Sequence, residues 1–324
     1  MKIAIIGATG EVGRMMIRNL VEFGVQIDGL DLYASKRSAG TSLYYMDEAL
    51  KVMELTAAAW DKAYDYVLFS AGSGVAKVQA PEALKACKLA IDNSSAFRKD
   101  EGIPLVVPEI NGELLKNYRG IVANPNCSTI QMVLPLAVLD KLFGLRKVVV
   151  STYQSVSGSG HKGLATLQAQ REGSEDLGDY PAVIDLNLIP QIGAWLDDGY
   201  CAEEEKMHSE TCKILNNDKI QVCATTVRVP VMYGHSISVY AEFEDRVDLN
   251  LAEQKLSQAE AISYSANTFT TPLDLGSSNE SHVSRLRHGG DEYSLAFWNV
   301  AHNIRLGAAT NAVKIMLKHA GYEA

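Results

Sequence analysis

One cysteine of this chain stands where a catalytic nucleophile would be effective. Cys127 follows Asn124-Pro125-Asn126, and the apolar periodicity after it predicts a helix that runs to about Phe143. Asn126 is a favourable N-cap residue, which would place Cys127 in the first helical turn. There the positive end of the helix dipole favours the thiolate, the form that attacks an acyl carbon. The alternative is a buried structural cysteine, which is our interpretation of the other cysteines.

Acyl transfer to a thiol requires a proton shuttle, and His235 is the first candidate. It lies directly before Ser236–Glu244, where apolar residues alternate as in a half-buried strand. A histidine at the end of a strand can project into a cleft, and its usual pKa of about 6.5 suits acid–base catalysis. His161, in a glycine-rich segment that could approach a cofactor, is the second candidate. An ordinary loop histidine is the alternative for His235.

Three glycines near the start of the chain predict a binding site for a dinucleotide. Gly7, Gly10 and Gly13 follow the apolar run Ile3–Ile6 and precede a helical pattern that begins at Val12. Glycine lets the backbone turn sharply and approach a pyrophosphate, which the helix N-terminus stabilises. A strand–helix turn without a ligand is the alternative interpretation.

The residues after the second predicted strand, Gly29–Tyr33, favour NADP over NAD as the cofactor. Asp31 stands near the position whose carboxylate would bind the ribose 2′-hydroxyl. However, Lys36 and Arg37 follow within Ser35–Gly40, and cations beside serine hydroxyls suit a 2′-phosphate. A solvated basic loop is the alternative.

The bulk properties exclude several other classes of protein. The 324 residues carry a formal net charge of −9, which argues against a nucleic-acid or acidic-membrane partner. Any anionic ligand must therefore be held by a few local cations. No apolar stretch approaches the roughly 20 residues of a membrane span. The cysteines are odd in number and include no Cys-x-x-Cys pair, so we expect neither a metal site nor a disulfide framework, in a cytoplasmic protein.

The order of the predicted elements indicates two domains. Strands that alternate with helices up to Asn124 predict the α/β class, with a Rossmann-type doubly wound parallel sheet and a helix over Pro81–Ala90. Later segments are rich in β-branched residues and predict an α+β domain with a mixed, largely antiparallel sheet. We expect an NADP-binding domain at 1–124, completed by a C-terminal helix at 303–324, and a second domain at 125–302.

Six motifs, in the same order along the chain, resemble those of aspartate-semialdehyde dehydrogenases. They are Gly7–Gly13, Arg37–Gly40, Ser94–Arg98, Asn126–Thr129, Gln154–Gly160 and Arg228–Ser236. The resemblance spans residue 3 to about residue 314 and implies that the second domain carries catalysis and dimerisation. It also implies an NADPH-dependent conversion of L-aspartyl 4-phosphate to L-aspartate 4-semialdehyde, in the biosynthesis of lysine, threonine and methionine. Cys127 would carry the thioester, Gln154 would orient the acyl group, and His235 would exchange the proton.

The resemblance implies further contacts with the substrate. Arg228 would hold the substrate carboxylate. Glu203 would position a neighbouring lysine or contact the substrate amine, although Glu204 and Glu205 could serve instead. The phosphate group would be bound by Arg98, Asn126 and Lys206.

The cofactor contacts and the assembly are also implied by the resemblance. The cofactor would be bound by Gly7, Thr9, Gly10, Glu11, Val12, Arg37, Ser38, Ser157, Gly158 and Asn303. The chain would form a homodimer or homotetramer, with Thr271–Glu292 as a candidate interface segment, and would act on a small molecule. Two other functions stay open. One is another acyl-phosphate reductase, such as N-acetyl-glutamyl-phosphate reductase, and the other is a non-catalytic NADP-binding protein.

Overall fold

The computed structural model describes residues 1–322, which form two compact units. One unit contains Met1–Pro125 together with the chain from Ala308 onward, and the other is Asn126–Gly307. Each unit contains its own β-sheet. Among the described residues, no helix is both long and apolar enough to cross a membrane.

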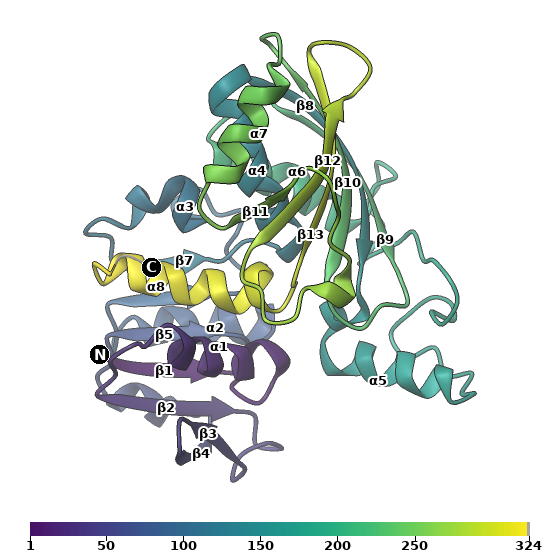
Figure 1. Cartoon of the computed structure of the whole chain (residues 1–324). Coiled ribbons are helices and arrows are strands. Elements are labelled where there is room, and N and C mark those ends of the chain that lie inside the picture. Colours follow the sequence, from purple (N-terminus) through teal and green to yellow (C-terminus); the bar gives the residue numbers. More distant parts are fainter. Residues whose placement is uncertain (323–324) are drawn as a thin grey trace. The chain divides into compact units, whose positions relative to one another are not determined.

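The first unit contains a seven-stranded sheet in the order β3-β4-β2-β1-β5-β6-β7 (Figure 1). Its strands are β1 (Lys2–Ile6), β2 (Gly29–Ala34), β3 (Ser42–Tyr45), β4 (Glu48–Glu54), β5 (Tyr66–Phe69), β6 (Leu89–Asp92) and β7 (Gly120–Ala123). All neighbouring strands pair in parallel except β3 and β4. Strands β5 and β6 are buried along their whole length, as expected where both faces of a sheet are covered. The predicted Rossmann-type fold is confirmed.

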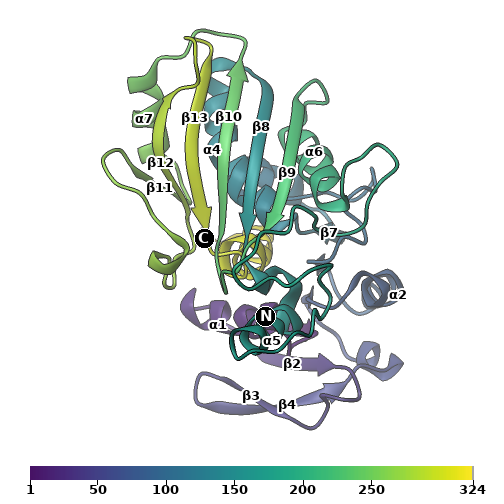
Figure 2. The same ribbon diagram turned by 90° about the vertical axis from the view of Figure 1, so that its right-hand side faces the viewer.

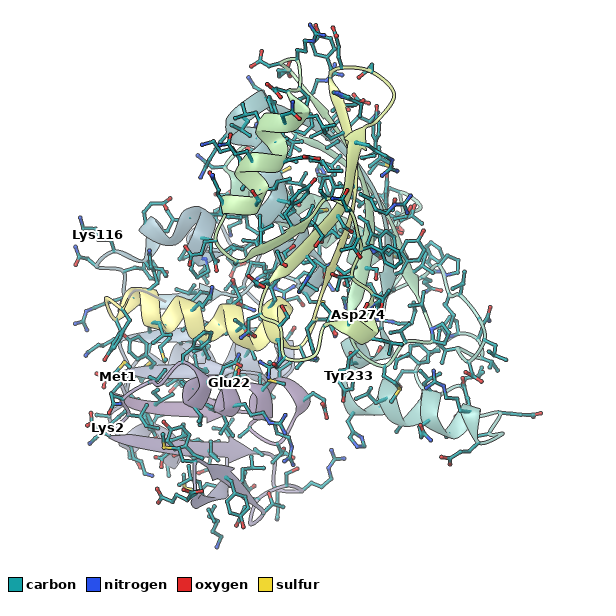
Figure 3. The ribbon with its side chains drawn as sticks, viewed as in Figure 1. Met1, Lys2, Glu22, Lys116, Tyr233 and Asp274 are labelled. Atoms are coloured by element: carbon teal, nitrogen blue, oxygen red, sulfur yellow. The ribbon has the colours of Figure 1, made fainter. Side chains whose placement is uncertain are left out.

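The helices of this unit are α1 (Glu11–Glu22), α2 (Ser73–Ala83), α3 (Pro108–Asn111) and α8 (Asn311–His319), with short 3-10 turns at Ala57–Asp61 and Gly112–Leu115. Helix α8 lies beside α1 and β6 (Figure 1), and Val313, Ile315 and Met316 enter the core of the unit. The Lys314 Nζ lies 2.7 Å from Glu109 Oε1, and both side chains are largely buried. The ammonium group of Met1, which Figure 3 labels, lies 2.7 Å from Asp28 Oδ2.

The helix predicted over Pro81–Ala90 is wrong. Helix α2 begins at Ser73 and ends at Ala83, and Ala90 lies in β6. Proline is frequent at the first position of a helix and is tolerated less well within one. In the structure Pro81 lies inside the last turn of α2, after a helix start that Gly72 caps without a side-chain hydrogen bond.

The C-terminal helix begins later than predicted. Residues Arg305–Thr310 form a π-helical turn, and α8 proper starts at Asn311. Asn303 is not helical because its side chain accepts a hydrogen bond from the backbone N–H of Gly234 at 2.9 Å. Helix α8 ends at His319, and the predicted end at residue 324 lies outside the described residues.

The second unit contains a six-stranded sheet in the order β11-β12-β13-β10-β8-β9 (Figure 2). Its strands are β8 (Leu145–Gln154), β9 (Gln221–Arg228), β10 (His235–Phe243), β11 (Ile262–Ser265), β12 (Ser281–His288) and β13 (Ser294–Ala301). Two pairs, β8–β9 and β11–β12, are parallel, and the other pairs are antiparallel. The predicted mixed, largely antiparallel sheet is confirmed.

The helices of the second unit are α4 (Cys127–Phe143), α5 (Gly160–Arg171), α6 (Ala202–Leu215) and α7 (Leu249–Gln258). Helix α4 lies behind β8 and β10 in Figure 2, and most of its side chains are buried. Helix α6 packs against α4 and β9. Because α4 is held by the sheet on one side and by α6 on another, its first residue has a fixed position within the unit.

The segment Thr271–Glu292, a candidate interface segment, contains regular secondary structure. It contains the short 3-10 turn η4 (Pro272–Asp274) and strand β12. Thr271 caps η4, because its backbone N–H and its hydroxyl both donate to Asp274, which Figure 3 labels. The role of this segment at a subunit interface stays a prediction.

Candidate active site

The glycine turn of the first unit opens into a hollow of about 560 Å³ at the carboxyl ends of β1, β2 and β5. Of the predicted cofactor residues, five line the hollow: Gly7, Thr9, Gly10, Arg37 and Ser38. Gly7 has a φ of +84°, and a Cβ there would lie 2.9 Å from the carbonyl carbon of Ser70, so only glycine fits. Glu11 and Val12 begin α1 directly after this turn. The hollow therefore offers a glycine turn, a helix start and a cation, the features that a dinucleotide requires.

Asp31 is engaged elsewhere. Its Oδ2 accepts hydrogen bonds from Lys62 Nζ at 2.6 Å and from the Tyr64 hydroxyl at 2.7 Å. The hydrogen bond to Asp31 raises the pKa of Lys62. The carboxylate lies in a hollow that Lys62 and Tyr64 help to line, whereas Arg37 and Ser38 line the glycine-turn hollow.

Arg98 lies just beyond the carboxyl end of β6. Its guanidinium group is largely buried, and Nη2 donates to the Asn93 carbonyl at 3.0 Å. Burial raises the pKa of the neighbouring Asp92, an effect that Ser94 and the charge of Arg98 oppose.

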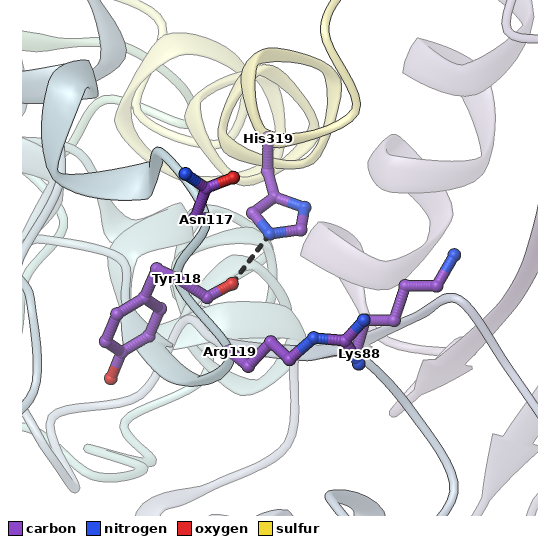
Figure 4. A pocket seen from close by; sticks show the side chains of 5 residues that line it. All are labelled: Lys88, Asn117, Tyr118, Arg119 and His319. Atoms are coloured by element: carbon purple, nitrogen blue, oxygen red, sulfur yellow. Dashed lines mark hydrogen bonds between the residues drawn. The ribbon is translucent and has the colours of Figure 1, made fainter.

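A separate hollow of about 270 Å³ lies at the amino ends of β6 and β7 in the same unit (Figure 4). It is lined by Lys88, Asn117, Tyr118, Arg119 and His319. Its histidine is held by the Tyr118 carbonyl, 2.8 Å from Nε2 (Figure 4). None of the predicted site residues lines this hollow.

In the second unit, Cys127 is the first residue of α4, and Asn126 is its N-cap as predicted. The Asn126 Oδ1 accepts from the backbone N–H groups of Ser128 and Thr129, at 3.0 and 3.3 Å. Cys127 is partly exposed and forms no disulfide. The position therefore combines a capped helix start, which favours a thiolate, with access for a ligand.

Helix α6 holds the cap from the other side. Its Glu203 Oε1 accepts from the Asn126 side-chain amide at 2.9 Å, and its Glu210 Oε2 accepts from the Asn126 backbone N–H at 2.6 Å. Glu210 is not among the residues predicted from the sequence. Its spacing of seven residues from Glu203 puts both carboxylates on one face of a helix, a signal that could have identified it.

Among the three successive glutamates, Glu203 contacts both Asn126 and Lys206. Burial would raise its pKa, but Lys206, Asn126 and Arg228 outweigh burial and lower it, and its Oε2 lies 3.1 Å from Lys206 Nζ. Glu204 instead accepts from the backbone N–H groups of Cys201 and Thr226, both at 2.8 Å. Glu203 is therefore the acid that contacts the cap and the lysine.

His235 is the first residue of β10 and is fully buried. Its Nδ1 accepts from the backbone N–H of Ser155 at 3.1 Å, so in the neutral ring the hydrogen lies on Nε2. Nε2 has no hydrogen-bond partner among residues 1–322. A Cβ on Gly158 would lie 3.4 Å from Nε2 and 2.7 Å from Arg228 Nη1. The structure thus brings His235, Arg228 and Gly158 together.

The pKa of His235 differs from the expected value. Burial, followed by the charge of Arg228, lowers it to about 3, although Glu203 opposes this effect. His235 is therefore neutral at physiological pH and presents a donor at Nε2. His161, the second candidate, is exposed on α5.

A polar network braces the segment that carries His235. The Arg228 Nη1 donates to the Ser155 carbonyl at 2.7 Å. The Asn303 Oδ1 accepts from Gly234 N–H at 2.9 Å and from the Ser157 hydroxyl at 3.2 Å. Ser155 is not among the predicted residues, because its backbone contact with the imidazole has no signature in residue type. The amide of Asn303 serves this network, and its contact with a cofactor stays a prediction.

Gln154 ends β8 and is almost fully buried. Its amide donates to the Thr152 hydroxyl at 3.3 Å. Gln131, on the buried α4, donates to the His235 carbonyl at 3.2 Å and was also missed. In the second unit, the predicted residues thus form a cluster around the α4 start and a cluster around His235.

The low pKa of His235 predicts a loss of stability in acid. The unfolded histidine, with a pKa of 6.5, binds more protons than the folded one between pH 6.5 and about 3, so stability falls as the pH falls. From pH 7 to pH 5 this group should cost about 2 kcal/mol of unfolding free energy. Urea unfolding at both pH values should show a smaller decrease for His235→Gln than for the unaltered chain. Equal decreases in unfolding free energy for the two proteins would contradict the low pKa of His235.

Comparisons with known proteins show which family the chain resembles along its length. Residues 2–118 match the family description "Semialdehyde dehydrogenase, NAD binding domain", and residues 135–306 match "Semialdehyde dehydrogenase, dimerisation domain". The chain is 43% identical to an aspartate-semialdehyde dehydrogenase of Aquifex aeolicus, with 97% of this chain and 96% of that protein covered. It is 41% identical to one of Bacillus subtilis, with 97% and 95% covered.

A solved structure gives the same likeness. The chain resembles aspartate semialdehyde dehydrogenase II of Vibrio cholerae, complexed with ASA, with a TM-score of 0.92 and 38% identity. The similarity covers 99% of this chain and 98% of that chain.

Proposed function

Since the chain belongs to the aspartate-semialdehyde dehydrogenase family, we propose that it converts L-aspartyl 4-phosphate to L-aspartate 4-semialdehyde with NADPH, through a thioester on Cys127. The observation that carries this proposal is the capped start of α4. There, Asn126 caps the helix N-terminus beside the thiol, and Glu203 contacts both Asn126 and Lys206. A thiolate at this position attacks the acyl carbon, the S–C bond forms, and phosphate leaves.

The cations of the second unit fit the anionic substrate. Arg228 offers a planar guanidinium that can bind a carboxylate with two hydrogen bonds, and its Nη1 is already oriented by the Ser155 carbonyl. Lys206 offers a point charge to the phosphate group and is oriented by Glu203. Asn126 completes the proposed phosphate contacts of this unit, and the phosphate contact predicted for Arg98, in the first unit, stays a prediction. Gln154, fixed by Thr152, would orient the acyl group.

His235 is proposed to stabilise the negative charge that develops on the substrate oxygen. NADPH, when bound, supplies the hydride that reduces the thioester carbon. The neutral His235 donates a hydrogen bond from Nε2 to the oxygen that becomes negative, because Nδ1 accepts from the Ser155 N–H. When the C=O bond forms again, the C–S bond breaks, the aldehyde is released and Cys127 returns to the thiolate. The imidazole is fully buried, where such a hydrogen bond is stronger than in water.

The cofactor preference rests on Arg37 and Ser38 in the glycine-turn hollow, since Asp31 is engaged with Lys62. Arg37→Ala should raise the KM for NADPH about 10-fold or more, because a charged hydrogen bond to the 2′-phosphate is lost. The KM for NADH, which lacks that phosphate, should change less than about two-fold. Arg119→Ala, in the separate hollow of the same unit, serves as the control. Equal effects on both cofactors would contradict a 2′-phosphate contact.

The reaction is tested in the direction of NADP reduction. Aspartate semialdehyde, inorganic phosphate and NADP are supplied together, and each is then omitted in turn. Formation of NADPH should require all three. The same assay with N-acetyl-glutamate semialdehyde tests the other acyl-phosphate reductase. Reaction of iodoacetamide with all five cysteines at one slow rate would favour the non-catalytic alternative.

The matched dimerisation domain indicates an oligomer, and we propose a homodimer. The face of the second sheet opposite α4 carries Val149, Tyr153, Tyr240 and Trp298, all at least partly exposed. The rings of Tyr153 and Trp298 pack together, with centroids 5.6 Å apart, and form an apolar patch. Light scattering after size-exclusion chromatography tests the dimer against the tetramer. A cytoplasmic location stays a prediction.

A further inference from the structure

We propose that Gly307 is a positioning residue that sets the place of the nucleophilic sulfur. It lies in the π-helical turn Arg305–Thr310, and its missing side chain faces the start of α4. A Cβ added to Gly307 would lie 2.7 Å from Cys127 Cβ, 3.0 Å from its Cα and 3.3 Å from its carbonyl oxygen. Carbon atoms in contact prefer about 3.5–4.0 Å, so residue 307 can lie this close to Cys127 only when it lacks a side chain.

Backbone conformation does not explain this glycine. Its φ lies outside the left-handed region, unlike that of Gly7 or Gly234. An alanine at 307 would therefore meet no backbone strain, and the three heavy atoms nearest its Cβ all belong to Cys127. This property makes the position a selective probe of the nucleophile.

Neither side of the contact can move away at low cost. On one side, Asn126 caps α4, and Glu210 and Glu203 on α6 bind the cap. Most side chains of α4 are buried, and tightly packed helices do not shift to admit a methyl group without strain.

On the other side of the contact, the turn Arg305–Thr310 is held by buried residues just before it and at its start. Asn303 and Leu306 are buried at 1% exposure each, and the Gly307 N–H donates to the His302 carbonyl at 3.3 Å. This bond spans five residues, as in a π-helical turn, a geometry frequent at functional sites. A methyl group at 307 would therefore displace Cys127 rather than the turn alone.

This inference rests on the proposed role of Cys127, and Gly307→Ala tests it. We expect kcat to fall about 10- to 100-fold, because a displacement near 1 Å of a reacting group can cost that much. The KM for NADP should stay within about two-fold, since the cofactor hollow is not lined by this turn. The rate at which iodoacetamide alkylates Cys127, followed by peptide mass spectrometry from pH 6 to 9, should fall by about five-fold or more.

Gly29→Ala is the matched control. Gly29 also has an ordinary φ, and no atom lies within 4 Å of its added Cβ, so turnover and alkylation should stay unchanged. A folded Gly307→Ala protein with the turnover and the Cys127 alkylation of the unaltered chain would overturn the proposal.

If Gly307→Ala folds poorly, a double-mutant cycle measured by Tm tests the proposal instead. Cys127→Gly removes the atom that the new methyl group meets most closely. The fall in Tm caused by Gly307→Ala should be at least halved in the Cys127→Gly background, since the effects of substitutions at two contacting residues are not additive. Equal falls in both backgrounds would overturn the proposal. Full activity of Cys127→Ser would refute the proposed function alone, because alkylation and Tm still test Gly307.

Discussion

Cys127→Ser is expected to reduce kcat by about a thousand-fold or more, the scale on which loss of a nucleophile acts. A serine hydroxyl needs a general base to take its proton. His235 is poorly suited to this role, because its Nδ1 accepts the Ser155 N–H, its Nε2 already carries hydrogen, and burial lowers its pKa to about 3. The thiol needs no such base, since the capped helix start favours the thiolate directly.

The measurement is NADPH formation from aspartate semialdehyde, phosphate and NADP. Cofactor affinity, followed by NADPH fluorescence, should be the same in the variant, because the glycine-turn hollow belongs to the other unit. Cys223→Ser is the control, since Cys223 is exposed on β9. If Cys127→Ser turned over at close to the original rate, a thioester route would be excluded.

His235→Asn should lower kcat by about 100- to 1,000-fold, the range attributed to the loss of one hydrogen-bond donor to a developing oxyanion. Asparagine is shorter, so its amide cannot place a donor where Nε2 lies. The change also removes the acceptor of the Ser155 N–H, a loss within the polar network that Arg228 and Asn303 brace. The decrease should therefore appear mainly in kcat, with a smaller increase in the KM for the semialdehyde.

His161→Asn provides the comparison for this prediction. His161 is the second candidate from the sequence and is exposed on α5. Its replacement should change kcat by no more than about two-fold. Loss of turnover on changing His161, with retention on changing His235, would reverse the two assignments.

The features that the sequence predicts well are local ones. Asn126 can cap a helix wherever its chain continues as one, so the start of α4 could be located from residue types alone. The same holds for Gly7, since a buried strand, a glycine and a helix follow within a few residues. The parallel sheet follows from the alternation of such units.

The features that it predicts poorly depend on partners distant in the chain. The pKa of His235 is set by burial and by Arg228, and neither follows from the Tyr-Gly-His-Ser segment. Glu210 is one of many glutamates until α6 places it against the Asn126 N–H, 84 residues away in sequence. The predicted start of α8 was wrong because the Asn303 side chain accepts a hydrogen bond from the Gly234 N–H, and the chain is not helical there.

The place of α8 has a consequence for how the protein is made. The core of the unit that starts at Met1 includes Val313, Ile315 and Met316 from the end of the chain, and Lys314 pairs with Glu109. A ribosome adds about 5–20 residues per second, so some tens of seconds separate the synthesis of the first strands from that of α8. During that interval the second unit can fold, while the sheet of the first exposes the apolar surface that α8 will cover. A message truncated before codon 308 would therefore yield a chain prone to chaperone capture and proteolysis, even with its cysteine, histidine and glycine turn all present.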